Sequence, residues 1–248
     1  LYERWVAFIG GGYDATDATG NAFFVVDIKT GQVIKEFSGL VDATGKKFAM
    51  AAPPKTVDIN GDGYVDKVYV GSLGNQMWVF DVSFDAITKK SDSQWSGKVL
   101  FEAPGAPPNK HPIYSQAAVA IDSASNVWVF FGTGDREDPR GSTCMERFYA
   151  VKDDGQGTYP RKEGDLKDVT NINTFTPPSD PPYKGWRMMM DQGEKILARP
   201  TIFNGLLYFT TYTPKEDPEP CTAGGTAKLY VVDFLSGGGA LSVDEPSD

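Results

Sequence analysis

The residues of this chain best suited to chemistry are the oxygen-bearing side chains of one short acidic segment. Residues 58–66, with the sequence DINGDGYVD, carry side-chain oxygens at positions 1, 3, 5 and 9 and a glycine at position 6. Ca²⁺ takes about six to eight oxygen ligands, and alternate residues of a tightly curled loop point inward, so this spacing is typical of a calcium-binding loop. We predict a Ca²⁺ site formed by Asp58, Asn60, Asp62, the backbone carbonyl of Tyr64, and Asp66.

The residues on either side of this loop indicate strands, not the helices of an EF-hand. Tyr69 stands at position 12, where an EF-hand has a bidentate glutamate, and Pro53 and Pro54 precede the loop. Without that glutamate we expect a modest affinity, with a Kd of roughly 10⁻⁵–10⁻³ M. The alternative is a turn rich in Asp, Asn and Gly that binds nothing. The number of matching positions favours the metal site.

Composition and charge argue against nucleic acid as a partner and against a transmembrane helix. The chain has 248 residues, a net charge of −9 and a pI of about 4.7, so its surface is unsuited to nucleic acid. No apolar run approaches the roughly 18 residues of a transmembrane helix. The chain begins at Leu1, without an initiator methionine or a signal peptide, and we expect a mature or partial product of a longer precursor.

The elements that must position the loop come from a fourfold internal repeat. Each repeat contains two short β-branched and aromatic runs separated by a glycine-containing loop, which is typical of paired strands. Recurrence at intervals of tens of residues indicates a propeller or solenoid. The four pairs of runs are residues 5–9 and 23–27, 67–71 and 77–81, 127–131 and 149–153, and 206–210 and 229–233.

These repeats predict an all-β fold, a β-propeller of four-stranded blades that forms a single domain over residues 1–248. In the last repeat, residues 200–203 form the inner strand, Asn204-Gly205 predicts a type I′ hairpin, and residues 240–243 are the candidate outer strand. In the first repeat no inner strand is visible before residue 5. Two architectures stay open: a closed propeller of four blades, near the lower limit, or a partial propeller.

The middle repeats also predict their edge strands. Residues 55–58 and 99–101 flank the second pair, and residues 117–121 and 186–190 flank the third. The last of these follows residues 154–185, a charged, glycine-rich and proline-rich stretch that we predict to be a surface insert.

The two cysteines predict a disulfide between neighbouring blades. Cys144 and Cys221 fall in equivalent loops of the third and fourth repeats, and such loops meet on one face of a propeller. The bond would contribute at most roughly 4 kcal/mol and would imply an oxidising compartment. The alternative is two free thiols in exposed loops.

No constellation of side chains indicates catalysis, and we predict that the chain is not an enzyme. His111 is the single histidine, lies beside Pro112, and is predicted to be a solvated loop residue. No Gly-x-Ser-x-Gly nucleophile motif occurs. Met188, Met189 and Met190 are interpreted as filling a half-buried strand.

Three blocks of the sequence resemble the C-terminal β-propeller of the PilY1/PilC family of type IV pilus proteins. The first is the acidic loop together with the strands that follow it, through residue 81. The second is FFGTG at 130–134 followed by FYAVKD at 148–153, and the third is GEKILARP at 193–200 leading to YFTTYTP at 208–214. The blocks keep the order of the family and span nearly the whole chain.

The resemblance implies a secreted protein at the pilus tip or on the outer membrane. In that family, calcium at this loop influences pilus extension and retraction, and the protein takes part in adhesion and surface sensing. By position, the resemblance assigns the calcium role to the same five residues, with Ca²⁺ as cofactor. It implies minor pilins or the pilus tip complex as partners, with cell or abiotic surfaces as further contacts.

Two other functions remain open. The segment VVDIKTG at 25–31 also resembles repeats of quinoprotein dehydrogenases, which need a quinone and a calcium ion in the central funnel, whereas the calcium loop predicted here joins two strands. The second alternative is a generic integrin-like calcium-binding scaffold propeller.

Overall fold

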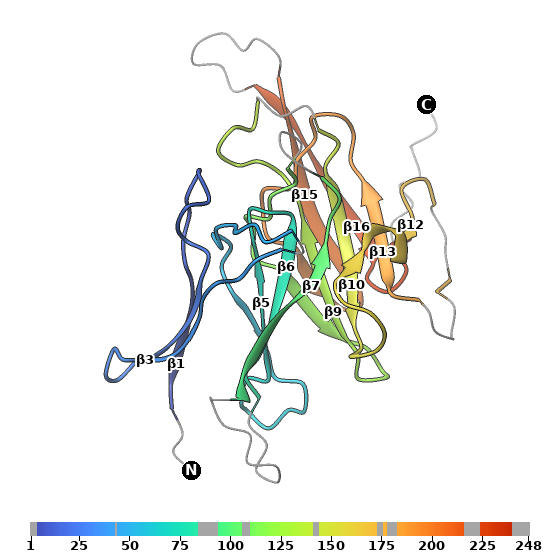
Figure 1. The fold of residues 1–248 in the computed structure, drawn as a ribbon. Coiled ribbons are helices and arrows are strands. Elements are labelled where there is room, and N and C mark those ends of the chain that lie inside the picture. The colour runs from blue at the N-terminus through green and yellow to red at the C-terminus, as the bar shows by residue number, and fades with distance from the viewer. Residues whose placement is uncertain are drawn as a thin grey trace, which may run out of the picture.

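The structure is a computed structural model in which four β-sheets follow one another along the chain (Figure 1). It describes residues 4–42, 44–83, 94–105, 110–140, 144–172, 176–177, 183–215 and 224–239. We number the sheets 1 to 4 in chain order. No helix among these residues is long and apolar enough to span a membrane.

Each sheet is built on an antiparallel meander. Sheet 1 contains β1 (Val6–Gly10), β2 (Phe23–Asp27) and β3 (Val33–Phe37). Sheet 2 contains β4 (Lys55–Val57), β5 (Lys67–Gly71), β6 (Gln76–Asp81) and β7 (Ser96–Glu102). Sheet 3 contains β8 (Ala118–Ile121), β9 (Val127–Gly132), β10 (Arg147–Asp153) and β13 (Gly185–Met189). Sheet 4 contains β14 (Thr201–Phe203), β15 (Leu206–Pro214) and β16 (Gly225–Asp233).

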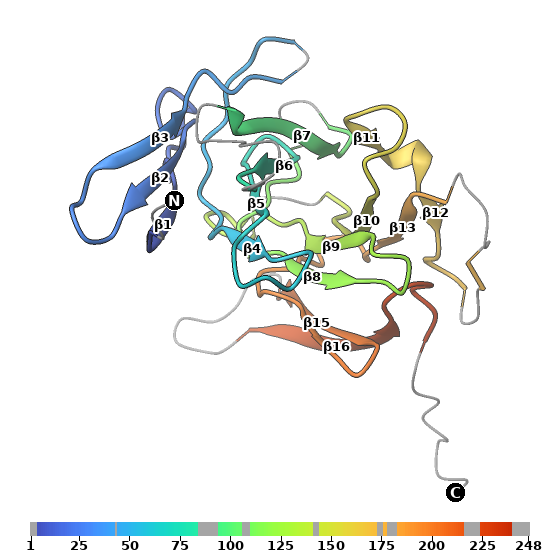
Figure 2. The same ribbon diagram turned by 90° about the horizontal axis from the view of Figure 1, so that it is seen from below.

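The sheets are arranged as successive propeller blades (Figure 2). Their innermost strands meet, because β8 contacts both β4 and β14. Among the described residues no strand pairs sheet 4 with sheet 1, so the four sheets form an open arc. The all-β propeller fold predicted from the repeats is therefore confirmed, and the blades do not close among the described residues.

The described strands of each blade agree with the predicted ones. Sheets 2 and 3 have the four predicted strands, and among the described residues sheet 1 has no inner strand, as the first repeat indicated. In sheet 4, Asn204 and Gly205 have φ values of 49° and 77°, which is the backbone of the predicted type I′ turn. The predicted outer strand at 240–243 lies outside the described residues.

Three apolar clusters fill the junctions between neighbouring sheets. Strands β6 and β9, which lie in the two central sheets, are buried along nearly their whole length, whereas β2 and β15 alternate between buried and less buried residues. The continuous apolar runs of the middle repeats follow from this burial on both faces. The aromatic pairs Phe23–Phe80, Phe101–Tyr149 and Phe148–Phe209 bridge the three junctions, with ring centroids 4.1, 4.5 and 4.0 Å apart.

In sheets 2 and 3, a glycine at the end of the second strand lets the linker to the next sheet pack closely against that strand. Gly71 ends β5 and Gly132 ends β9, and a Cβ atom at either would collide with Ile113 or Ile196 of the linker to the next sheet. The amides of Ile113 and Ile196 each donate to the carbonyl of the residue after the glycine, at 3.1 Å. The linkers are thus fixed by backbone hydrogen bonds as well as by packing.

The segment 154–185, predicted to be a surface insert, also extends two sheets. β11 (Arg161–Lys162) pairs in parallel with β7, and β12 (Lys167–Asp168) pairs in parallel with β13. A short 3-10 helix, η2 (Glu163–Asp165), joins β11 to β12. Leu166 and Val169 are buried in the clusters on either side of sheet 3. The insert therefore ties the outer edge of sheet 2 to that of sheet 3.

Candidate metal site and buried polar networks

The predicted calcium loop is the connection between β4 and β5, at an exposed end of sheet 2. Lys55, Thr56 and Val57 pair with Tyr69, Val68 and Lys67 in an antiparallel register. The loop closes this hairpin, because the Asp66 amide donates to the Val57 carbonyl at 2.9 Å. Strands thus flank the loop on both sides, as the sequence predicted.

Asp58, at the first position, organises the turn through its carboxylate. Its Oδ1 accepts from the Gly61 amide and its Oδ2 from the Gly63 amide, each at 2.7 Å. Both glycines have positive φ values, 76° and 90°, which place them in the left-handed region that favours glycine. The glycines therefore permit the tight curl that turns the loop amides toward Asp58.

The remaining predicted ligands continue this curl. The Asn60 Oδ1 accepts from the Asp62 amide, and the Asp62 Oδ1 accepts from the Tyr64 amide, each at 2.9 Å. The Asp66 Oδ2 accepts from the Ile59 amide at 2.7 Å, across the mouth of the loop. All four ligand side chains named from the sequence therefore belong to one local hydrogen-bonded structure.

The donor set is chemically suited to Ca²⁺, because it consists of three carboxylates, one side-chain amide and a backbone carbonyl. Within the part of the chain that the structure describes, no three His, Cys, Asp or Glu side chains form a group that could hold a metal ion. In this conformation the carboxylates accept from loop amides instead of converging on one point. Calcium binding at Asp58, Asn60, Asp62, Tyr64 and Asp66 stays a prediction.

The exit of the loop is tied to two sheets. The Asp66 carbonyl accepts from the amide of Val82, just after β6, at 2.9 Å. Lys67 forms an ion pair with the buried Asp153 of sheet 3 at 2.8 Å, and Tyr69 donates to the same carboxylate at 2.9 Å. A change in the backbone near Asp66 would therefore alter the contacts at the junction of sheets 2 and 3.

The prediction that His111 is a solvated loop residue is wrong. Its relative exposure is 5%, and its Nδ1 lies 2.8 Å from Oε2 of Glu146, which is fully buried. The Thr133 hydroxyl donates to the same carboxylate oxygen at 2.7 Å. The Arg147 guanidinium lies 2.9 Å from the His111 Nε2. The linker between β7 and β8, which carries His111, packs between sheets 2 and 3, so the side chain is buried although the backbone is a loop.

A second buried network surrounds Glu194, which the sequence reasoning did not assign to a site. Its carboxylate accepts from the hydroxyls of Thr211 and Tyr230 and from Lys228. Burial, the largest single influence, raises the pKa of Glu194, but these hydrogen bonds and one from the Asp191 amide outweigh it, so the pKa is lowered. This network fixes the linker between sheets 3 and 4.

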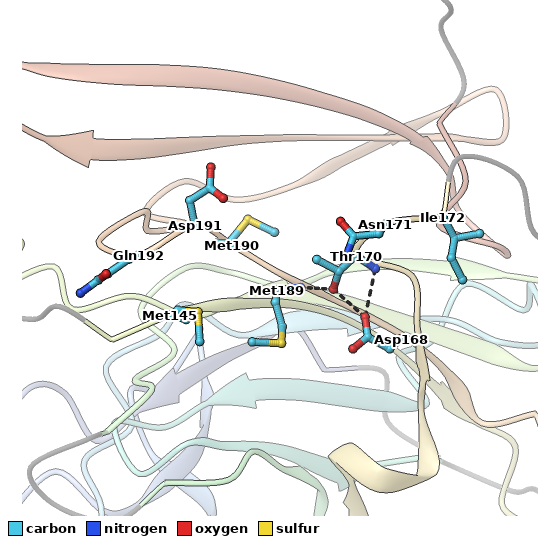
Figure 3. A pocket seen from close by; sticks show the side chains of 9 residues that line it. All are labelled: Met145, Asp168, Thr170, Asn171, Ile172, Met189, Met190, Asp191 and Gln192. Atoms are coloured by element: carbon cyan, nitrogen blue, oxygen red, sulfur yellow. Dashed lines mark hydrogen bonds between the residues drawn. The ribbon is translucent and has the colours of Figure 1, made fainter.

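A shallow groove of about 490 Å³ opens at the outer edge of sheet 3 (Figure 3). It is lined by Met145, Asp168, Thr170, Asn171, Ile172, Met189, Met190, Asp191 and Gln192. Its two carboxylates are held in ion pairs, since Asp168 contacts Arg187 at 2.8 Å and Asp191 contacts Lys228 at 2.7 Å. Met188 and Met190 are buried, in agreement with their interpretation as strand filling.

The predicted disulfide involves a residue outside the described part of the chain. Cys144 is partly buried just before β10, whereas Cys221 is not among the described residues. The bond stays a prediction.

Comparisons with known proteins identify a family with this architecture. Residues 2–168 match the family model of the PilY1 beta-propeller domain. The chain is 27% identical to a type IV pilus biogenesis factor PilY1 homolog of Xylella fastidiosa, over 98% of this chain and 18% of that protein. It is 23% identical to the type IV pilus biogenesis factor PilY1 of Pseudomonas aeruginosa, over 95% of this chain and 24% of that protein. The chain therefore spans a quarter or less of the length of these relatives.

A solved structure has the same fold. The crystal structure of the Pseudomonas aeruginosa PilY1 C-terminal domain aligns with 94% of this chain and 57% of that domain, with a TM-score of 0.70 and 18% sequence identity.

Proposed function

Because the chain belongs to the PilY1 β-propeller family, we propose that it is the calcium-binding propeller part of a type IV pilus protein. In this proposal, Ca²⁺ at the loop between β4 and β5 tunes pilus extension, retraction and surface adhesion. The observation that carries the proposal is the loop itself. A run of oxygen-bearing residues at calcium-site spacing is folded into a tight hairpin in a chain whose relatives are named type IV pilus biogenesis factors.

The residues of the loop have separate roles in this mechanism. Asp58, Asp62 and Asp66 would supply carboxylate oxygens, Asn60 its amide oxygen and Tyr64 its backbone carbonyl. The bound ion would supply positive charge that offsets the mutual repulsion of three carboxylates. At about 100 times its Kd, calcium would add roughly 2.7 kcal/mol to the free energy of unfolding.

The last residues of the loop would transmit the effect of calcium binding to the blades. Asp66 is bonded on one side to Val57 and on the other to Val82, and Lys67 reaches Asp153 of sheet 3. Fixing the Asp66 backbone would therefore stiffen both the hairpin and the junction of sheets 2 and 3. Calcium would act on the partner surface by this stiffening, without any catalytic step.

The proposed partners are minor pilins or the pilus tip complex, with cell or abiotic surfaces as further contacts. The proposed location is extracellular or on the outer membrane, at the pilus tip. The names of the relatives support an association with the pilus machinery.

Capture of purified minor pilins on the immobilised chain tests this proposal. We expect more capture in calcium than in chelator, and we expect Asp62→Ala to abolish the difference. Asp42→Ala is the matched control, because Asp42 also accepts from loop amides in an exposed turn but lies outside the acidic loop. Capture of pilins that is equal in calcium and chelator would contradict the calcium mechanism, and no capture in either condition would contradict the proposed partner.

A further inference from the structure

The chain contains two Asn-Gly pairs, and they lie in different hydrogen-bonding environments. Asn60-Gly61 is part of the acidic loop, and Asn204-Gly205 is the turn between β14 and β15. An asparagine followed by glycine is prone to spontaneous deamidation, because glycine has no side chain that obstructs its backbone nitrogen. Both asparagines are exposed to solvent. Exposure alone therefore does not distinguish the two pairs.

Deamidation at such a pair proceeds through a cyclic imide. The glycine nitrogen gives its proton to a solvent base and attacks the asparagine Cγ, so that a new N–Cγ bond forms. The Cγ–Nδ2 bond breaks, and the amide nitrogen takes a proton from solvent and leaves as ammonia. Water then opens the imide at either carbonyl and gives aspartate or isoaspartate. The reaction needs a glycine N–H that can lose its proton and an asparagine side chain that can rotate.

The hydrogen bonds of the acidic loop oppose both requirements. The Gly61 amide donates to Asp58 Oδ1 at 2.7 Å, which holds its proton. The Asn60 side chain is held at both atoms of its amide, because its Oδ1 accepts from the Asp62 amide at 2.9 Å and its Nδ2 donates to the Asp62 carboxylate at 3.1 Å. These three hydrogen bonds must open before the imide can form.

The turn between β14 and β15 has no such protection. Among the residues that the structure describes, neither the Asn204 side chain nor the Gly205 amide has a hydrogen-bond partner. Apart from its chain neighbours, no atom lies within 4 Å of the Cβ position of Gly205. β14 has three residues and pairs only with β15 in the described sheet, so we expect this turn to open at low cost.

We propose that Asn204 is a site of spontaneous deamidation and that the hydrogen bonds of the acidic loop protect Asn60 from the same reaction. Isoaspartate lengthens the main chain by a carbon atom, which the two-residue type I′ turn does not accommodate. The Gly205 carbonyl accepts from the Phe234 amide at 3.2 Å, so the modification also loosens the segment that follows β16. The inference does not depend on calcium binding.

Peptide mapping by mass spectrometry tests the proposal, because conversion of the amide to a carboxylate changes the mass of the peptide that carries it. The purified chain is incubated in chelator at mildly alkaline pH, and both Asn-Gly pairs are followed in the same samples. We expect Asn204 to deamidate roughly tenfold faster than Asn60, since three hydrogen bonds oppose the reaction at Asn60. In guanidinium chloride, where these bonds are absent, we expect similar rates at the two pairs.

Asp58→Ala is the matched variant, because it removes the acceptor of the Gly61 amide and leaves both Asn-Gly pairs in place. We expect faster deamidation of Asn60 and an unchanged rate at Asn204, which also reports that sheet 4 is intact. Asp42→Ala, which removes a comparable acceptor in another exposed turn, should change neither rate. Equal rates at the two pairs in the folded parent, or no reaction at Asn204 under conditions in which the denatured chain reacts, would overturn the proposal. So would an unchanged rate at Asn60 in Asp58→Ala.

Discussion

The Asp58 Oδ2 atom lies 2.7 Å from the amide nitrogen of Gly63, five residues later in the chain. This contact depends on Gly63, whose φ of 90° turns the amide back toward the first residue of the loop. The carboxylate and the glycine therefore form one unit, and the shape of the proposed calcium site depends on both.

Gly63→Ala should weaken calcium binding strongly and lower the free energy of unfolding only moderately. An alanine at this positive φ is strained by roughly 1–2 kcal/mol, and relief of the strain would move the amide away from Asp58. We expect calcium to raise the melting temperature of the parent chain but to have little effect on the variant. Gly39→Ala is the control, because Gly39 also has a positive φ and open space around it. A full calcium response in Gly63→Ala would contradict this role of the glycine.

Gly132→Ala should destabilise the junction of sheets 3 and 4. The new Cβ would collide with the side chain of Ile196, and overpacking of this kind costs roughly 1–3 kcal/mol. Gly164→Ala is the comparison, because Gly164 has a negative φ and no atom near its Cβ position. Urea unfolding should show a clear loss for the first variant and little change for the second. Equal stability of the two variants would mean that the linker does not pack as described.

The lowered pKa of Glu194 predicts a pH dependence of stability. A carboxyl whose pKa is lowered on folding stabilises the protein above its ordinary value of roughly 4.3, and this contribution is lost as the pH falls through the lowered value. Unfolding measured from about pH 6 to pH 2 should therefore show a smaller acid-induced loss for Glu194→Gln than for the parent. Asp191→Asn, which removes an exposed carboxylate on the same Lys228, should retain most of the loss. A Glu194→Gln profile parallel to that of the parent would contradict this assignment.

The predicted disulfide is tested by counting thiols in the denatured chain. We expect no reactive thiol without reductant and two with it, because the only cysteines are Cys144 and Cys221. Reduction should lower the free energy of unfolding by up to roughly 4 kcal/mol. Two reactive thiols in protein isolated under oxidising conditions would contradict the bond.

The blades were predictable because their signals are local. The continuous apolar runs around Trp78 and Trp128, the Asn204-Gly205 turn and the acidic loop each lie within a few residues of sequence. Even β13 could be assigned to its blade, since an apolar run after a polar stretch completes the four-strand pattern of the third repeat.

The buried networks were not predictable, because their members are far apart in the sequence. The sequence next to His111 contains a proline and indicates a surface residue, but its network partners Thr133 and Glu146 lie directly after β9 and directly before β10 of sheet 3. Glu194 meets Lys228 and Tyr230 only after β15 and β16 have paired. The parallel pairing of β11 with β7 and of β12 with β13 likewise follows from packing, because strands of two residues leave no periodic pattern in the sequence.

Calorimetric titration of calcium into the purified chain, beside Asp62→Ala and Asp42→Ala, tests the central claim most directly. The account predicts saturable binding at one site, with a Kd of roughly 10⁻⁵–10⁻³ M, in the parent chain and in Asp42→Ala, and none in Asp62→Ala. Absence of binding to the parent chain at millimolar calcium, or unchanged binding to Asp62→Ala, would contradict it.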